Sequence, residues 1–295
     1  MLFTIADFNI SITSANHNED LLTLLPWFKP FKAKTDGTDD MLFSLHVDDA
    51  MRPVPKEQRT HIRIFDTGNG NTKVDRTHDG GYQYIIQDIQ GRNCCLLITD
   101  SSFTHCRCAL NGDYNMRQFG LNNALMLSFA FSACRYHTVL IHASLVRHEG
   151  YGYAFTAQSG TGKSTQVSFW LRYIPQCDLM NDDNPIIRII DGRPYIYGSP
   201  WSGKTPCYRN IKAPLGAITQ IHRAPENSIE PLRPIEAFAT LLPACSTMKW
   251  DEHVFDCICN TISNIISTTS IYTLHCLPNA ESALLCKEAI SKQNN

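Results

Sequence analysis

The segment from residue 152 to residue 174 constrains the fold of this chain more than any other part of its sequence. A short apolar run, Gly152–Thr156, leads directly into Ala157-Gln158-Ser159-Gly160-Thr161-Gly162-Lys163-Ser164, the first glycine-rich segment. Behind it, apolar residues recur at the spacing of one helix face, namely Val167, Trp170, Leu171 and Ile174. The pattern predicts a strand, a glycine-rich loop and a helix, an arrangement whose backbone N–H groups and helix N-terminus bind phosphate.

A second glycine-rich segment, Gly198–Thr205, matches the phosphate-loop pattern G-x-x-x-x-G-K-[ST] without exception, whereas the first has Ala157 at the position of the initial glycine. The surroundings of the second segment argue against phosphate binding. Pro200 lacks a backbone donor, Trp201 is bulky, and no helical apolar pattern follows. We therefore assign phosphate binding to the first segment. We expect the second to be a turn that either borders the site or only exposes its lysine.

Two adjacent carboxylates, Asp182 and Asp183, end a short apolar stretch that we interpret as a strand. Asn184-Pro185 then favours the end of this strand, so that neighbouring side chains can serve one site. Phosphoryl transfer to a hydroxyl needs a base for the hydroxyl proton and ligands for Mg²⁺, and adjacent acids can divide these tasks. An ordinary turn with solvated carboxylates is the alternative.

The composition bears on partners and location. Lys plus Arg number 26 and Asp plus Glu number 28, so the net charge is −2 and offers no positive field for nucleic acid. We expect no membrane partner, because no apolar stretch is long enough to cross a bilayer and the start has no signal-peptide pattern. The twelve cysteines are scattered without any C-x-x-C, which indicates reduced, buried thiols in a cytoplasmic protein.

Residues 1–118 are predicted to form a β-rich N-terminal region. Short apolar segments alternate there with turn sequences, among them Asp36-Gly37, Asn69-Gly70 and Asp79-Gly80-Gly81. The strands expected between these turns include Leu42–Val47, Ile62–Phe65, Tyr82–Ile86 and Cys95–Ile98. From Asn122 the apolar pattern becomes helical, and we place the domain boundary after residue 118.

Residues 119–295 are predicted to form an α/β domain, which makes the whole chain α+β. The apolar run His137–Val146 is interpreted as one strand, and a turn joins it to the strand that precedes the first glycine-rich segment. The other elements expected in this domain are strands at Leu215–Ile221 and Ile271–His275, and helices at Pro234–Leu242, Glu252–Ile266 and Ala280–Ile290.

Three segments of the second domain resemble the catalytic domain of HPr kinase/phosphorylase, which shares its P-loop fold with ATP-dependent phosphoenolpyruvate carboxykinase. They are Ile141–Val146, Ser159–Ser164 and Asp182-Asp183, and the resemblance covers about residues 138–215. The resemblance implies a P-loop kinase domain of this type, with ATP and Mg²⁺ bound to it.

The resemblance also implies roles for the residues around the first glycine-rich segment. Lys163 would hold the β and γ phosphates, and Ser164 and Asp183 would bind Mg²⁺. The nucleotide-binding residues would be Ser159, Gly160, Thr161, Gly162, Lys163, Ser164 and Thr165.

Two further catalytic residues follow from the same resemblance. Asp182 would be the base that accepts the hydroxyl proton, and His142 would lie beside the phosphates, although a lone histidine is more often part of a core. Arg209 and Lys204 are candidates for substrate contacts, with ordinary exposed side chains as the alternative.

These features predict an ATP- and Mg²⁺-dependent kinase that phosphorylates a serine-like hydroxyl of a protein, a peptide or a small molecule. The resemblance adds the reverse reaction, phosphorolysis. The alternative is a non-catalytic nucleotide-binding regulator, or a scaffold whose β-rich region binds a peptide. The sequence leaves the acceptor and self-association into a homo-oligomer open.

Overall fold

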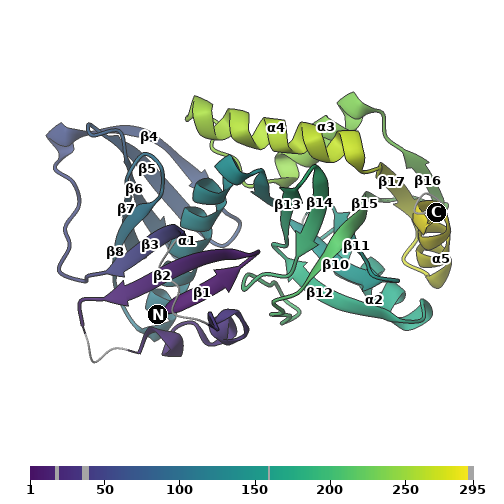
Figure 1. The fold of residues 1–295 in the computed structure, drawn as a ribbon, viewed down its shortest axis with the longest axis horizontal. Coiled ribbons are helices and arrows are strands. Elements are labelled where there is room, and N and C mark those ends of the chain that lie inside the picture. Colours follow the sequence, from purple (N-terminus) through teal and green to yellow (C-terminus); the bar gives the residue numbers. More distant parts are fainter. Residues whose placement is uncertain (17–19, 35–39, 159, 292–295) are drawn as a thin grey trace. The chain divides into compact units, whose positions relative to one another are not determined.

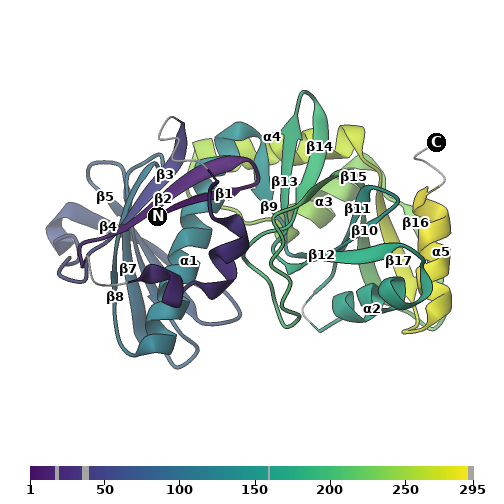
Figure 2. The same ribbon diagram turned by 60° about the horizontal axis from the view of Figure 1, so that its bottom comes forward.

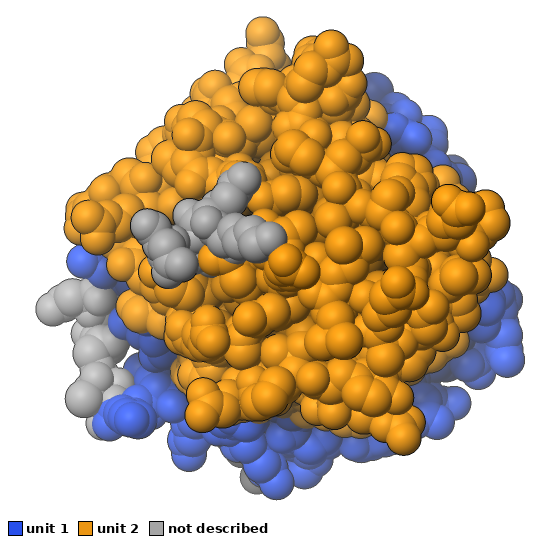
Figure 3. Space-filling model, turned by 90° about the vertical axis from the view of Figure 1, so that its right-hand side faces the viewer, with its two compact units in different colours: residues 1–133 blue, residues 134–295 orange. Residues whose placement is uncertain are grey.

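The computed structural model describes residues 1–16, 20–34, 40–158 and 160–291. The chain divides into two compact units, Met1–Ala133 and Cys134–Asn295, which Figure 3 colours separately. The division lies behind helix α1 (Tyr114–Ala133) and not at residue 118, because the whole of this helix packs on strands of the first unit. The helix also begins before Asn122, where its apolar pattern becomes visible in the sequence.

The first unit is an eight-stranded sheet in the order β1-β2-β3-β8-β7-β6-β5-β4, with α1 packed against it (Figure 1). Its strands are β1 (Leu2–Ile5), β2 (Phe8–Ser14), β3 (Met41–Val47), β4 (Arg59–Asp66), β5 (Asn71–Thr77), β6 (Tyr82–Gln87), β7 (Asn93–Thr99) and β8 (His105–Leu110). The β-rich character predicted for this region is confirmed. The turns at Asn69-Gly70 and Asp79-Gly80-Gly81 join neighbouring strands, whereas Asp36-Gly37 lies outside the described residues.

A glycine and small thiols allow α1 to approach the sheet closely. A Cβ atom on Gly120 would lie 2.7 Å from the carbonyl oxygen of Cys94 and 2.8 Å from the Cβ of Cys95. Cys106 and Cys108 are buried in the same unit. All twelve cysteines of the chain are free, as predicted, and the predicted burial is confirmed for nine of them.

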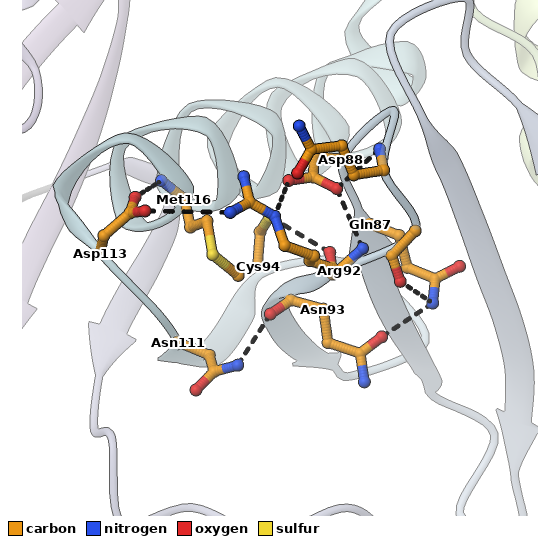
Figure 4. Close-up of polar contacts among 10 residues, drawn as sticks. Gln87, Asp88, Arg92, Asn93, Cys94, Asn111, Asp113 and Met116 are labelled. Carbon is orange, nitrogen blue, oxygen red and sulfur yellow. Dashed lines mark hydrogen bonds and ion pairs between the residues drawn. The ribbon is translucent and has the colours of Figure 1, made fainter.

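The turn between β6 and β7 is fixed by hydrogen bonds to one carboxylate (Figure 4). Asp88 accepts from the backbone N–H groups of Gln90 at 3.0 Å and Arg92 at 2.9 Å, and from Nε of Arg92 at 2.7 Å. Desolvation raises the pKa of Asp88, but the hydrogen bonds from Arg92 outweigh it and hold the pKa below its usual value. Asp113 accepts from the N–H of Met116 at 3.0 Å and so caps the start of α1.

The second unit contains a nine-stranded mixed sheet in which α2 packs with α5 and α3 packs with α4 (Figures 1 and 2). Its strands are β9 (Thr138–Leu140), β10 (Ala143–His148), β11 (Tyr151–Thr156), β12 (Cys177–Asp183), β13 (Ile186–Ile190), β14 (Arg193–Tyr197), β15 (Lys212–Arg223), β16 (Ser228–Pro231) and β17 (Ile271–Cys276). Its α-helices are α2 (Lys163–Tyr173), α3 (Pro234–Ala244), α4 (Glu252–Thr268) and α5 (Ala280–Ser291). Within the ranges given above, none of the helices combines the length and apolar character needed to cross a membrane.

The predicted strand, loop and helix around the first glycine-rich segment are confirmed as β11, the following turn and α2. Val167 and Trp170 of the helix and Ile174 directly after it are buried in the core, whereas Leu171 is 40% exposed and does not belong to the packed face. The strand predicted to end in two carboxylates is also confirmed, because β12 ends at Asp183.

The prediction of a single strand at His137–Val146 is wrong, because this run forms two strands, β9 and β10. The backbone of Ile141 and His142 separates them and donates hydrogen bonds to the carbonyl oxygens of Pro185 at 3.1 Å and Ala244 at 2.7 Å. The chain changes partners at this point, since β9 pairs with β13 and β10 pairs with β11 and β12. An apolar run does not reveal such a change.

Strand directions bring several chain segments to one edge of the sheet. β10 is antiparallel to both β11 and β12, and β11 is parallel to β15. The carboxyl ends of β11, β12 and β15 therefore lie at one edge, where β10 begins. Ligands of open α/β sheets bind outside the carboxyl ends of strands. This edge carries the first glycine-rich segment, Asp183, Arg223 and His142.

Candidate functional site

The first glycine-rich segment faces open space. Gly160 has a φ of 78° and Gly162 a φ of 131°, both in the region that favours glycine. A Cβ atom on either residue would have no described atom within 4 Å, apart from its own chain neighbours. Because the first N–H groups of a helix have no partner inside the helix, the start of α2 at Lys163 adds further donors. A backbone of this kind can bind an anion.

Six of the seven predicted nucleotide-binding residues, 160–165, lie on this turn and the first turn of α2. Ser164 and Thr165 are exposed, and the N–H of Thr161 closes the turn by donating to the carbonyl oxygen of Gln158 at 3.1 Å. Ser159 lies outside the described residues. Nucleotide binding by these residues stays a prediction.

Lys163 lies across the first glycine-rich segment. Its Nζ donates to the carbonyl oxygen of Ala157 at 3.3 Å and lies 3.1 Å from Nε2 of His142. Burial lowers the pKa of Lys163, and the carboxylates of Asp183 and Asp182 act in the opposite direction. The lysine is therefore a half-buried cation that two acids help to keep charged.

His142 connects this cation to the end of β12. Its Nε2 lies 3.3 Å from Oδ1 of Asp183 as well as 3.1 Å from Nζ of Lys163, and its side chain is 46% exposed. The unprotonated nitrogen can accept a hydrogen bond from the ammonium, and the protonated nitrogen can donate one to the carboxylate. One ring atom thus lies within hydrogen-bond distance of both groups.

Asp183 is held at the end of its strand by two asparagines. Its Oδ2 accepts from Nδ2 of Asn184 at 2.7 Å, and its N–H donates to Oδ1 of Asn181 at 3.0 Å. The side chain is 34% exposed, so oxygen atoms of Asp183 remain accessible to a ligand.

Asp182 is buried, and both of its carboxylate oxygens accept hydrogen bonds from the protein. Oδ1 accepts from Oγ of Ser144 at 2.7 Å, and Oδ2 accepts from the N–H of Thr205 at 3.0 Å. Ser144 lies opposite Asp182 on β10, which explains the first bond. Each carboxylate oxygen keeps a further acceptor site, because it has two lone pairs.

The second glycine-rich segment lies along β12 and uses its glycines for close packing. A Cβ atom on Gly203 would lie 2.6 Å from the carbonyl oxygen of Asp182, and one on Gly198 would clash with the carbonyl oxygen of Arg209. Buried Asn181 donates from Nδ2 to the carbonyl oxygen of Ser199 at 3.2 Å and to its Oγ at 3.1 Å. No α-helix follows within the described residues before β15. The segment borders the site through Asp182 but does not form an open phosphate loop.

In the part of the chain that the structure describes, no hydrogen bond joins Lys204 or Arg209 to Lys163. Lys204 is exposed on the second glycine-rich segment and has no hydrogen bond or ion pair to any residue that the structure describes. Arg209 donates to Oδ2 of Asp178 at 2.7 Å, at the start of β12. Arg147 holds the same carboxylate with two bonds, at 3.0 and 2.9 Å.

The three-residue cluster of Arg147, Asp178 and Arg209 lies on the sheet face opposite α2. Val146 packs with Trp170 of α2, and the next side chain along a strand points to the other face. Desolvation raises the pKa of Asp178, but hydrogen bonds from Arg147 and Arg209 outweigh it and leave the pKa lowered. The position of Arg209 therefore does not support the prediction that it contacts the substrate.

Sequence reasoning missed Arg223, the last residue of β15. Its Nε donates to the carbonyl oxygen of Thr161 at 2.9 Å, and its second terminal nitrogen donates to that of Gly160 at 2.6 Å. No local pattern marks this arginine, because only the parallel pairing of β11 with β15 brings it to the first glycine-rich segment.

No group of three or more His, Cys, Asp and Glu side chains comes together as a metal site in the part of the chain that the structure describes. Ser164 and Asp183, predicted to bind Mg²⁺, offer one hydroxyl and one carboxylate. A Mg²⁺ ion in a phosphoryl-transfer site typically takes one or two carboxylates and completes its shell with phosphates and water. Ser164 and Asp183 therefore fit a Mg²⁺ ion that is bound together with a nucleotide, but they do not form a complete metal site by themselves.

Comparisons with known proteins add little. No protein-family model matches the chain, and no curated protein matches it. Among solved structures, the chain is similar to the Hpr(Ser) kinase/phosphatase from Coxiella burnetii, with 10% sequence identity and a TM-score of 0.32. The match covers 53% of this chain and 99% of that one.

Proposed function

We propose that this chain is an ATP- and Mg²⁺-dependent kinase that transfers a phosphoryl group to a serine-like hydroxyl of a protein, a peptide or a small molecule. One observation carries the proposal. Lys163, behind an open glycine turn, shares Nε2 of His142 with the carboxylate of Asp183. An open backbone that can bind phosphate, a cation and an acid at one sheet edge are the parts that phosphoryl transfer requires.

The open space in front of Gly160 and Gly162 supports nucleotide binding, because phosphate oxygens can approach the backbone there without meeting a side chain. Ser164 and Asp183 would hold Mg²⁺, which spreads the charge of the transferred group when bound. Lys163 would orient the β and γ phosphates with its ammonium group. His142 would lie between Lys163 and Asp183, with its Nε2 within hydrogen-bond distance of both.

In this proposal Asp182 accepts the proton of the acceptor hydroxyl at a lone pair that Ser144 and Thr205 leave free. The same two hydrogen bonds favour a second candidate function. If Asp182 only anchors the second glycine-rich segment, the chain is a nucleotide-binding regulator or a peptide-binding scaffold without transfer activity. A cytoplasmic location and phosphorolysis with inorganic phosphate belong to the kinase proposal as expectations.

Two lysines provide a matched test of nucleotide binding. We expect Lys163→Ala to weaken ATP binding at least tenfold, about 1.4 kcal/mol, because the ammonium beside the open turn is lost. Lys204→Ala should leave the affinity unchanged. Isothermal titration of ATP with Mg²⁺ into both variants measures this, and loss of binding only in the Lys204 variant would move the nucleotide to the second segment.

The acid residues separate the two candidate functions. Transfer from γ-labelled ATP to serine peptides and to small alcohols is measured for the wild type, Asp182→Asn and Asp183→Asn. If Asp182 is the base of a kinase, Asp182→Asn should abolish phosphoryl transfer and keep the affinity for ATP. Asp183→Asn should lose the part of the ATP affinity that depends on Mg²⁺. Tight ATP binding by the wild type without transfer to any acceptor would support the regulator.

A further inference from the structure

Arg223 holds the first glycine-rich segment from its outer side. Two nitrogens of one guanidinium donate to two successive carbonyl oxygens, those of Gly160 at 2.6 Å and Thr161 at 2.9 Å. The side chain is exposed and lies outside the buried core of the unit. The guanidinium makes no other hydrogen bond to a residue that the structure describes.

Peptide planarity turns these two bonds into a constraint on the other side of the segment. In a trans peptide the carbonyl and the next N–H point in opposite directions. The bond to the carbonyl of Thr161 thus directs the N–H of Gly162 away from Arg223, on a residue whose surroundings are open. The peptide group between Gly160 and Thr161 is held on both sides. Its N–H donates to the carbonyl oxygen of Gln158, and its carbonyl oxygen accepts from Arg223.

The chemistry of the side chain matters as well as its charge. A guanidinium presents its donors in a rigid planar fork, whereas an ammonium is a point charge on a flexible stem. Only the fork can hold two neighbouring carbonyls in a fixed relative orientation. Gly160 and Gly162 give the backbone more accessible conformations than other residues would. The hydrogen bonds from Arg223 therefore restrict the backbone more here than they would at an ordinary turn.

We infer that Arg223 is a positioning residue, which orients the backbone N–H groups of the first glycine-rich segment toward a phosphate-bearing ligand. Its place at the end of β15 makes this possible, because β15 pairs in parallel with β11 and runs beyond it to the edge where the segment begins. For nucleotide binding the inference rests on the proposed function, whereas the effect on the loop does not.

The first test needs no nucleotide. Hydrogen–deuterium exchange of peptides covering residues 157–166 is compared in the wild type, Arg223→Ala, Arg223→Lys and Arg193→Ala. Arg193 is a matched control, because it is an exposed arginine at a strand end whose side chain has no hydrogen bond to a described residue. We expect exchange several-fold faster in both Arg223 variants, with unchanged melting temperatures and no change in the control. Unchanged exchange in Arg223→Ala would overturn the inference.

The second test separates orientation from charge. With the wild type binding ATP, we expect about tenfold weaker affinity in Arg223→Ala and no recovery in Arg223→Lys, which keeps the charge and loses the fork. Full recovery in Arg223→Lys would reduce Arg223 to an electrostatic contact and overturn the positioning role. If even the wild type binds no ATP, the proposed function fails, and the exchange experiment still decides whether Arg223 orders the segment.

Discussion

The two glycine-rich segments of this chain share a sequence pattern and have opposite environments. In the first, Gly160 and Gly162 adopt positive φ and face space in which a Cβ atom would meet nothing among the described residues. In the second, Gly198 and Gly203 lie so close to neighbouring backbone carbonyls that no side chain fits. In the first segment glycine allows backbone conformations that other residues rarely adopt. In the second it allows two chain segments to pack closely.

This contrast shows that a pattern match alone does not reveal the environment of a glycine-rich segment. The pattern records where glycine and lysine occur and not why glycine is needed. The flanking residues carry that information, because a helix follows Lys163, whereas a proline and an extended stretch follow Lys204. The segment that departs from the pattern at Ala157 is the one with the open backbone.

The largest expected difference between the two segments is in how much stability the protein loses when one of their glycines is replaced. We expect Gly198→Ala to lower the free energy of unfolding by about 3 kcal/mol, because its Cβ atom would collide with backbone that cannot move cheaply. Gly160→Ala should cost only about 1 kcal/mol, from its positive φ. Urea denaturation of both variants measures the difference. Equal losses, or the reverse order, would contradict this account of the two segments.

A somewhat smaller effect is expected at the asparagine that holds the second segment. Asn181→Ala removes the donor to the carbonyl oxygen of Ser199 and the acceptor for the N–H of Asp183, which should cost about 2 kcal/mol. Asn264→Ala, at an exposed position of α4, serves as the control and should change stability by less than about 0.5 kcal/mol. Denaturation curves in which Asn181→Ala matches this control would show that the segment does not depend on Asn181.

The smallest expected effect is the pH dependence of stability that comes from Asp178, which Arg209 contacts just after the second segment. Arg147 and Arg209 hold the pKa of Asp178 below its unfolded value of about 3.9 despite desolvation. Its stabilising contribution is therefore present above about pH 4 and is lost as pH falls through the lowered pKa. Because these side chains are more than a third exposed, we expect about 1 kcal/mol or less.

The measurement is the unfolding free energy of Asp178→Asn and the wild type between neutral and acid pH. The two should converge as the carboxylate of the wild type becomes protonated. Asp256→Asn, at an exposed position of α4, is the control. A difference that persists below the titration range would assign the effect to shape and not to charge.

The sequence predicts features that depend on local chemistry. The apolar pattern behind Lys163 gives α2, and Asn184-Pro185 gives the end of β12. The same reasoning fails where distant segments decide the outcome. It misses the break at His142, because β9 and β10 have different partners, and it misses Arg223, because strand pairing alone brings it to the loop.

The helix α1 illustrates the intermediate case. Its apolar pattern becomes visible only near Asn122, although the helix begins at Tyr114. Asp113 is a recognisable N-cap residue, and its hydrogen bond to the N–H of Met116 confirms that role. A search for capping residues would have placed the start of the helix correctly from the sequence.

The buried thiols of the two units provide reporters of motion that need no engineering. Burial raises the pKa of Cys106 in the first unit, and of Cys245 and Cys286 in the second, to about 12. Such thiols carry almost no thiolate at neutral pH and react with alkylating reagents only when the surrounding structure opens. Because each unit contains its own set, the rate of alkylation at each cysteine would time the opening of one unit independently of the other.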